Sequence, residues 1–171
     1  ERVWESTEYG FLSNHGSLLP EYRGWANINW YMINGESEYG LQAYQLSEEI
    51  DGGKLVYDVN RGKPINVTID INESMYIADL LENVRSKHAK QINKIVDLLK
   101  RDDLVFIEQD ESAATYCCHR GPEDGEIDWT KTTEDIYNFI RAQSEPYPGA
   151  FSYYNNEQFK IWRASIPADM D

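Results

Sequence analysis

Apolar positions along the 171-residue chain alternate between two spacings. Apolar residues at every second position predict strands, and apolar residues at every third or fourth position predict amphipathic helices. The first spacing predicts strands or extended segments over residues 11–15, 39–46, 54–59, 65–71, 104–108 and 114–119.

The longest helical pattern runs from Glu73 to about Lys100. Its apolar residues fall close to one stripe, which predicts that the helix packs against another element. Because His88 lies on this stripe among aliphatic residues, we interpret it as a structural histidine and not as a catalytic one. We expect Asn72 to cap the amino end of the helix.

Two shorter helices and a hairpin complete the pattern. Residues 25–34 have helical spacing, and a later helix is predicted from Thr132, where Asp135 follows at the spacing of a capping box. Two strands around Asn155-Asn156 predict a hairpin. The mixture of strands and helices predicts an α/β chain, divided into a larger α/β portion over residues 1–110 and a smaller C-terminal subdomain over residues 111–171.

The chain's composition indicates a folded protein with a strong acidic bias. Hydrophobic residues make up 41% and aromatic residues 13% of the sequence, which is enough for a packed core. The formal net charge is −14, and a broad phosphate-binding surface needs clustered Lys and Arg instead. The charge therefore argues against a nucleic-acid partner, although it leaves room for a local basic pocket that holds one diphosphate.

The only two cysteines, Cys117 and Cys118, are neighbours and cannot join distant parts of a secreted domain. With His119 they lack the separated spacing of a zinc site, so we expect no metal. The sequence contains neither an apolar run of about 18 residues nor a charged and apolar leader. These features predict a cytoplasmic protein that does not contact a membrane.

Two loops contain the residues with the clearest chemical potential. The first opens with His15 at the end of a predicted strand and continues to Gly24, and open α/β sheets bind ligands beyond the ends of their strands. The second contains Asp51-Gly52-Gly53 between two predicted strands. A histidine can exchange a proton near neutral pH, and glycines let the backbone approach a ligand closely.

Together the loops resemble the folate-dependent formyltransferases, a family with methionyl-tRNA, glycinamide ribonucleotide and sugar N-formyltransferases. The family's His-x-Ser-Leu-Leu-Pro-x-Tyr-Arg-Gly loop appears as residues 15–24, and its Asp-x-Gly loop as residues 51–53. Residues 34–40 also resemble the segment that joins these loops. The resemblance implies the C-terminal part of a Rossmann-like sheet followed by a small α+β subdomain, with 10-formyltetrahydrofolate as the formyl donor and no metal.

The resemblance also implies roles for individual residues. His15 and Asp51 correspond to two members of a catalytic Asn-His-Asp set, so we expect them within hydrogen-bond reach of each other. The family's asparagine stands two residues before the histidine, where this chain has Ser13, whereas Asn14 directly precedes His15. We expect a bulge that turns Asn14 into the site, and a regular strand would place Ser13 there instead. The remaining expected contacts are Gly52 and Gly53 for the folate, and Ser17, Tyr22, Arg23 and Trp25 for the acceptor.

The last third of the chain helps to choose the acceptor. Residues 120–129 and 146–153 resemble the C-terminal subdomain of tRNA and sugar formyltransferases, and residues 149–153 look closer to enzymes that formylate UDP-4-amino-4-deoxy-arabinose. With the acidic charge, this favours a nucleotide-linked amino sugar over methionyl-tRNA. A noncatalytic nucleotide-sugar-binding or assembly module is the third hypothesis. The residues leave open whether the protein forms a homo-oligomer.

The chain starts at Glu1, and only about 14 residues precede His15. Members of the family have a longer preceding α/β half that forms much of the folate pocket. We therefore expect the sequence to be a fragment of a longer enzyme.

Overall fold

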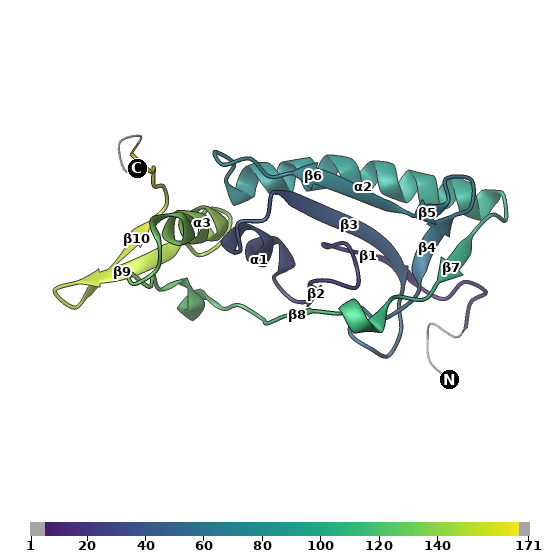
Figure 1. The fold of residues 1–171 in the computed structure, drawn as a ribbon, viewed down its shortest axis with the longest axis horizontal. Coiled ribbons are helices and arrows are strands. Elements are labelled where there is room, and N and C mark those ends of the chain that lie inside the picture. The colour runs from purple at the N-terminus through teal and green to yellow at the C-terminus, as the bar shows by residue number, and fades with distance from the viewer. Residues whose placement is uncertain (1–5, 168–171) are drawn as a thin grey trace.

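A six-stranded sheet and one long helix form the larger part of the computed structural model, which describes residues 6–167 (Figure 1). The order of hydrogen-bonded strands is β1-β3-β4-β5, with β6 also paired to β3 and β7 to β4, and every pair is antiparallel. The strands are β1 (Leu12–His15), β3 (Glu38–Gln45), β4 (Leu55–Asp58), β5 (Lys63–Pro64), β6 (Asn66–Asp70) and β7 (Val105–Ile107).

Helix α2 (Ile77–Lys100) covers one face of this sheet (Figure 1). Its buried Leu80, Ile95 and Leu98 lie in clusters with sheet residues, as the apolar stripe predicted. Gln91 of the helix is also buried, and its amide donates hydrogen bonds to the backbone carbonyls of Leu41 and Ile65. These contacts fix the sheet against the helix.

The predicted cap of α2 is wrong, because the helix begins four residues later than the pattern indicated. Asn72 instead accepts a hydrogen bond from the backbone N–H of Ser74 in the turn before the helix. Tyr76 is the N-cap residue, and its backbone N–H donates to the Asp79 carboxylate over 3.0 Å. The hydrogen-bonding capacity of the Asn72 side chain is therefore used in this turn, before the helix starts.

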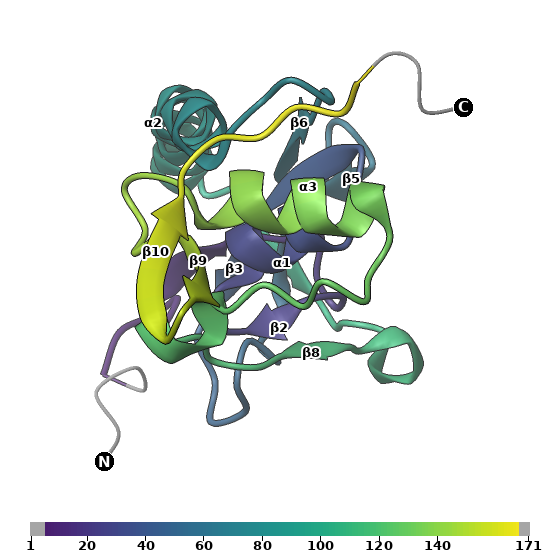
Figure 2. The same ribbon diagram turned by 90° about the vertical axis from the view of Figure 1, so that its left-hand side faces the viewer.

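Helices α1 (Asn27–Ile33) and α3 (Thr133–Gln143) pack together at one end of the sheet (Figure 2). Thr132 caps α3 as predicted, since its hydroxyl accepts from the backbone N–H of Asp135 over 3.1 Å. Beside α3 lies the predicted hairpin of β9 (Ala150–Tyr154) and β10 (Glu157–Ile161). Its turn residues Asn155 and Asn156 have φ angles of 51° and 65°, as a primed turn requires.

A parallel pairing joins two segments that are far apart in the sequence. Strand β2 (Arg23–Gly24) pairs with β8 (Tyr116–Cys117), which is shorter than the strand predicted over residues 114–119. The short 3-10 helix η2 (Glu111–Ala113) precedes β8, and the 3-10 helix η3 (Pro122–Gly125) follows it. This pairing holds the loop after His15 against residues that come about 90 positions later.

Candidate active site

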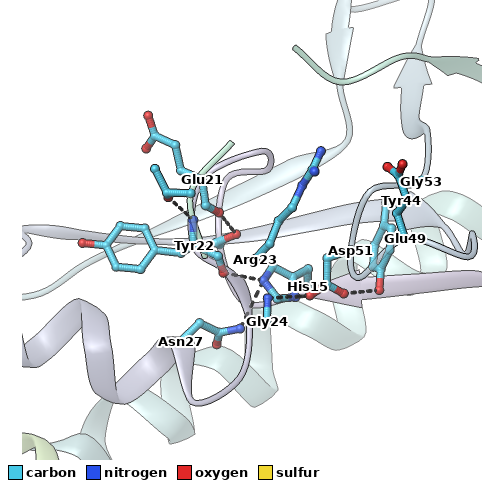
Figure 3. Close-up of polar contacts among 12 residues, drawn as sticks. His15, Glu21, Tyr22, Arg23, Gly24, Asn27, Tyr44, Glu49, Asp51 and Gly53 are labelled. Carbon is cyan, nitrogen blue, oxygen red and sulfur yellow. Dashed lines mark hydrogen bonds and ion pairs between the residues drawn. The ribbon is translucent and has the colours of Figure 1, made fainter. Parts of the chain in front are cut away.

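His15 is the last residue of β1 and lies on the sheet face opposite α2. Its register partner is Gln42, and its ring meets that of Tyr44 edge to face at 6.3 Å between centroids. The histidine is buried, with 7% of its surface exposed. The end of β1 thus presents the imidazole to the loops at this edge (Figure 3).

Asp51 lies beside His15, as the sequence led us to expect. Its Oδ2 is 3.4 Å from His15 Nδ1, while Oδ1 accepts a hydrogen bond from the Tyr44 hydroxyl over 2.7 Å. Oδ2 also accepts from the backbone N–H of Gly24 over 2.8 Å. Burial is the main cause that raises the pKa of Tyr44, and the adjacent Asp51 carboxylate raises it further. The Tyr44 hydroxyl therefore remains a donor at neutral pH. The carboxylate is therefore fixed from three sides.

The backbone of Asp51 adopts a left-handed conformation with φ of 53°, which is uncommon for a residue with a side chain. The Gln109 amide donates to the carbonyls of Asp51 and Gly53 over 2.7 and 2.6 Å and so braces this conformation. Sequence reasoning missed Gln109, because a lone glutamine after a short strand gives no signal of its contacts.

Arg23 has a structural position that contradicts its expected contact with the acceptor. Its side chain is completely buried, and its guanidinium donates to Gln109, Glu111 and the Tyr116 hydroxyl. The hydrogen bonds that Arg23 donates to the Glu111 carboxylate are the main cause that raises the pKa of Arg23. Since these bonds use the five N–H groups of a guanidinium, none remains for a substrate.

Asn14 also differs from expectation, because β1 pairs with β3 in regular register and has no bulge. Asn14 lies opposite Ala43 and lines a groove beside α2 together with His88 and Ile92. Its side-chain oxygen is buried without a hydrogen-bond partner in the described residues. In a regular strand Asn14 faces away from His15, and Ser13 shares the face of His15.

Three other expected contacts have structural explanations. Ser17 is completely buried and its hydroxyl donates to the Glu21 carbonyl, so it stabilises the loop. A Cβ on Gly53 would lie 1.7 Å from the Gln45 carbonyl oxygen, so this glycine is needed for close packing of the chain on itself. A Cβ on Gly52 would meet the Glu49 side chain at 2.7 Å, which likewise gives it a packing role.

The two aromatic residues expected to contact the acceptor, Tyr22 and Trp25, differ in their exposure to solvent. The Tyr22 ring lies 4.2 Å from that of Tyr31 between centroids, and its hydroxyl donates to Glu36 over 2.6 Å. Trp25 has 52% of its surface exposed, next to the loop that carries Gly24. Of the four residues expected to contact the acceptor, Trp25 is therefore the one most accessible to a ligand.

Asn27 is a further residue near His15 that sequence reasoning missed. Its amide nitrogen lies 3.2 Å from His15 Nε2, which is also 2.8 Å from the Tyr22 carbonyl oxygen (Figure 3). Asn27 is the first residue of α1 and follows the N-cap residue Ala26. A polar side chain near the start of a predicted helix was the one available signal.

Cavities of the described residues include one of about 380 Å³ lined by Tyr22 and Trp30, and one of about 530 Å³ beside α3. Neither includes His15 or Asp51. Residues 6–167 form no cluster of three or more His, Cys, Asp or Glu side chains that would suit a metal ion. None of their helices has the length and apolar character of a membrane span.

Two family models match most of the sequence. The model described as formyl transferase matches residues 1–83, and the model of the formyl transferase C-terminal domain matches residues 121–170. The chain belongs to the formyl transferase family. The resemblance inferred from the two loops is thereby confirmed.

Solved structures of formyltransferases share the fold. Methionyl-tRNA formyltransferase from Clostridium thermocellum is 23% identical with a TM-score of 0.69. The match covers 92% of this chain and 64% of that enzyme. WlaRD, a sugar 3N-formyl transferase solved with dTDP and 5-N-formyl-THF, is 21% identical with a TM-score of 0.71. The match covers 93% of this chain and 54% of WlaRD. A 4-N formyltransferase from Francisella tularensis is 21% identical with a TM-score of 0.70 (91% and 63% coverage). The predicted α/β class is confirmed, and the chain spans less than two thirds of these relatives.

Proposed function

We propose that this chain is the part of a folate-dependent N-formyltransferase that carries His15 and Asp51, and that the acceptor is the amine of a nucleotide-linked amino sugar. The observation that carries the proposal is the pair itself. A buried imidazole lies 3.4 Å from a carboxylate that Tyr44 and Gly24 hold in place. Such an arrangement suits proton transfer by the histidine, with the carboxylate orienting the ring and stabilising its positive charge.

In the proposed reaction, the acceptor amine forms a bond to the formyl carbon of 10-formyltetrahydrofolate. The bond between that carbon and the folate nitrogen N10 then breaks. His15 donates its proton to N10 and receives the proton lost by the amine, so the products are a formamide and tetrahydrofolate. General acid–base catalysis of this kind typically contributes about 10²–10⁴-fold to the rate.

Two observations favour a sugar nucleotide as the acceptor. WlaRD, which shares the fold, is a sugar 3N-formyl transferase, and its structure was solved in the presence of dTDP. The net charge of −14 also opposes the broad phosphate contacts that a tRNA needs. A cytoplasmic location, where the folate donor and the sugar nucleotide would meet, remains part of the proposal.

Methionyl-tRNA is the second candidate acceptor, because the enzyme from Clostridium thermocellum has the same fold. A noncatalytic sugar-nucleotide-binding module is the third candidate. It is favoured by the two cavities described above, which do not include His15 or Asp51. We rank both behind the sugar formyltransferase.

The full-length protein that contains this chain should be incubated with 10-formyltetrahydrofolate and, separately, a dTDP-linked 3-amino sugar, a UDP-linked 4-amino sugar and methionyl-tRNA. We expect a formamide product with an amino sugar and none with tRNA, measured by mass spectrometry. Transfer to tRNA alone would replace the proposal by the second candidate. Sugar-nucleotide binding without any transfer would favour the noncatalytic module.

A further inference from the structure

The position of Asn27 bears on a requirement of the proposed reaction. When an amine attacks the formyl carbon, the carbonyl oxygen gains negative charge and needs hydrogen-bond donors in fixed positions. The side chain expected to donate, Asn14, lies opposite Ala43 in a regular strand and lines the groove beside α2. Another residue must therefore supply a side-chain amide if one is used.

The hydrogen bonds of His15 identify a candidate. A backbone carbonyl can only accept, so the 2.8 Å contact with the Tyr22 carbonyl requires a proton on His15 Nε2. Nε2 then cannot accept a hydrogen bond from the Asn27 amide nitrogen 3.2 Å away. The proton on Nε2 is taken up by the Tyr22 carbonyl, so the Asn27 amide N–H beside it keeps its capacity to donate to a ligand.

The other end of the Asn27 amide contacts Tyr39. The Tyr39 hydroxyl donates to Asn27 Oδ1 over 3.4 Å, and the amide nitrogen lies on the side of His15. Burial raises the pKa of Tyr39, so this hydroxyl keeps its proton. Gly16 leaves room for the arrangement, because a Cβ there would lie 2.4 Å from Asn27 Oδ1 and 2.0 Å from the Tyr39 oxygen.

We propose that Asn27, and not Asn14, donates its amide N–H to the formyl oxygen as that oxygen becomes negatively charged. The inference rests on the proposed formyl transfer. Asn27 is suited to this role because it is only partly buried, its amide nitrogen lies 3.2 Å from His15 Nε2, and its amide oxygen contacts a neighbouring hydroxyl. A positioned amide donor beside the proton carrier is the kind of group that stabilises an oxyanion.

The test compares turnover of Asn27→Ala and Asn27→Asp with turnover of Ser13→Ala, Asn14→Ala and the control Asn34→Ala, using full-length protein. Asn34 is the asparagine at the opposite end of α1. We expect both Asn27 variants to lower kcat by about 10²–10³-fold with little change in KM, as loss of an oxyanion donor does. The other three variants should stay within about threefold of wild type.

Two further measurements separate a catalytic loss from a loss of folding. The thermal midpoint and the affinity for 5-formyltetrahydrofolate, which occupies the donor site without reacting, should be unchanged in the Asn27 variants. If one of the two Asn27 variants unfolds, the kcat of the other variant tests the assignment. If both unfold, Gly16→Ala, which displaces the Asn27 side chain, must reproduce the loss of kcat for the assignment to stand.

Specific outcomes overturn the assignment. Wild-type kcat in the Asn27 variants would refute it while leaving the proposed function intact, provided that wild-type protein transfers formyl and His15→Ala does not. A large loss in Ser13→Ala alone would move the role to Ser13. An inactive wild-type protein would refute the proposed function and the assignment of Asn27 with it.

Discussion

At the scale of single residues, the site depends on a few side chains held in defined states. Asp51 has a left-handed backbone conformation, a type of strain that persists where surrounding contacts enforce it and that often marks functional sites. Its carboxylate is fixed by Tyr44 and Gly24 before any ligand arrives. The proposed proton transfer between His15 and its substrates would benefit from this prior organisation, because orientation then need not be gained during the reaction.

We predict that His15→Ala in the full-length protein lowers kcat for formyl transfer by about 10²-fold or more, because the proton carrier is lost. The effect should be seen in steady-state assays with an amino-sugar nucleotide. Circular dichroism should show a native fold, and His88→Ala serves as the control because this histidine lies in the groove beside α2. Wild-type turnover by His15→Ala would eliminate the catalytic role.

At the scale of elements, Arg23 links the loop after His15 to segments from the second half of the chain. Its guanidinium joins Gln109 and Glu111, while its backbone pairs with β8. Gln109 in turn holds the loop of Asp51. One buried cation therefore connects the histidine loop and the aspartate loop, which explains its burial better than a substrate contact does.

We predict that Arg23→Met lowers the free energy of unfolding by about 3 kcal/mol, because it leaves the buried Gln109 amide oxygen without its donor and removes a charged hydrogen-bond network. Urea denaturation followed by circular dichroism measures the change. Arg61→Met, at an exposed position, should change stability by less than about 0.5 kcal/mol. Unchanged stability together with a raised KM for the acceptor would instead restore the substrate-binding hypothesis for Arg23.

Strand β4 and helix α2 are joined by an ion pair with a testable pH dependence. Asp58 is buried, and one of its carboxylate oxygens is 2.6 Å from Lys94 Nζ. The hydrogen bond from Lys94 is the main cause that lowers the pKa of Asp58 below its ordinary value of 3.8. A lowered folded-state pKa stabilises the protein above pH 3.8, and this stabilisation disappears as pH falls through the folded-state pKa.

We therefore predict that Asp58→Asn lowers the free energy of unfolding by about 2 kcal/mol at pH 7 and that the difference shrinks below about pH 4. Urea denaturation at pH 7, 5, 4 and 3 follows the change. Asp70→Asn, an exposed position of β6, is the matched control and should have a small effect at each pH. A difference that does not depend on pH would show that packing, and not the charge of Asp58, accounts for the loss.

At the scale of the whole molecule, the dominant property is the charge of −14 on 171 residues. Repulsion among surface carboxylates opposes the compact state, and salt screens it within about 10 Å at 0.1 M. The charge acts on stability and on the choice of partners, and it does not specify the fold.

We predict that raising NaCl from 0.02 to 0.3 M increases the thermal midpoint by about 2–4 °C, which corresponds to about 1 kcal/mol for a chain of this size. Differential scanning calorimetry measures the midpoint. The same increase in osmolality produced with a neutral solute serves as the control, and it should give a smaller shift. A midpoint that falls with salt would mean that attractive ion pairs outweigh the repulsion.

Sequence by itself predicted the family, the α/β class, most helices and strands, and the closeness of His15 and Asp51. These follow from local signals: apolar spacing determines which face an element buries, Asn155-Asn156 determines a turn, and two loops carry matching residues. Only the tertiary structure decided that Arg23 is buried, that Asn14 turns away and that Asn27 reaches His15. The physical reason is that strand register and contacts across about 90 residues fix where a side chain points, and neither is encoded in a residue's immediate neighbours.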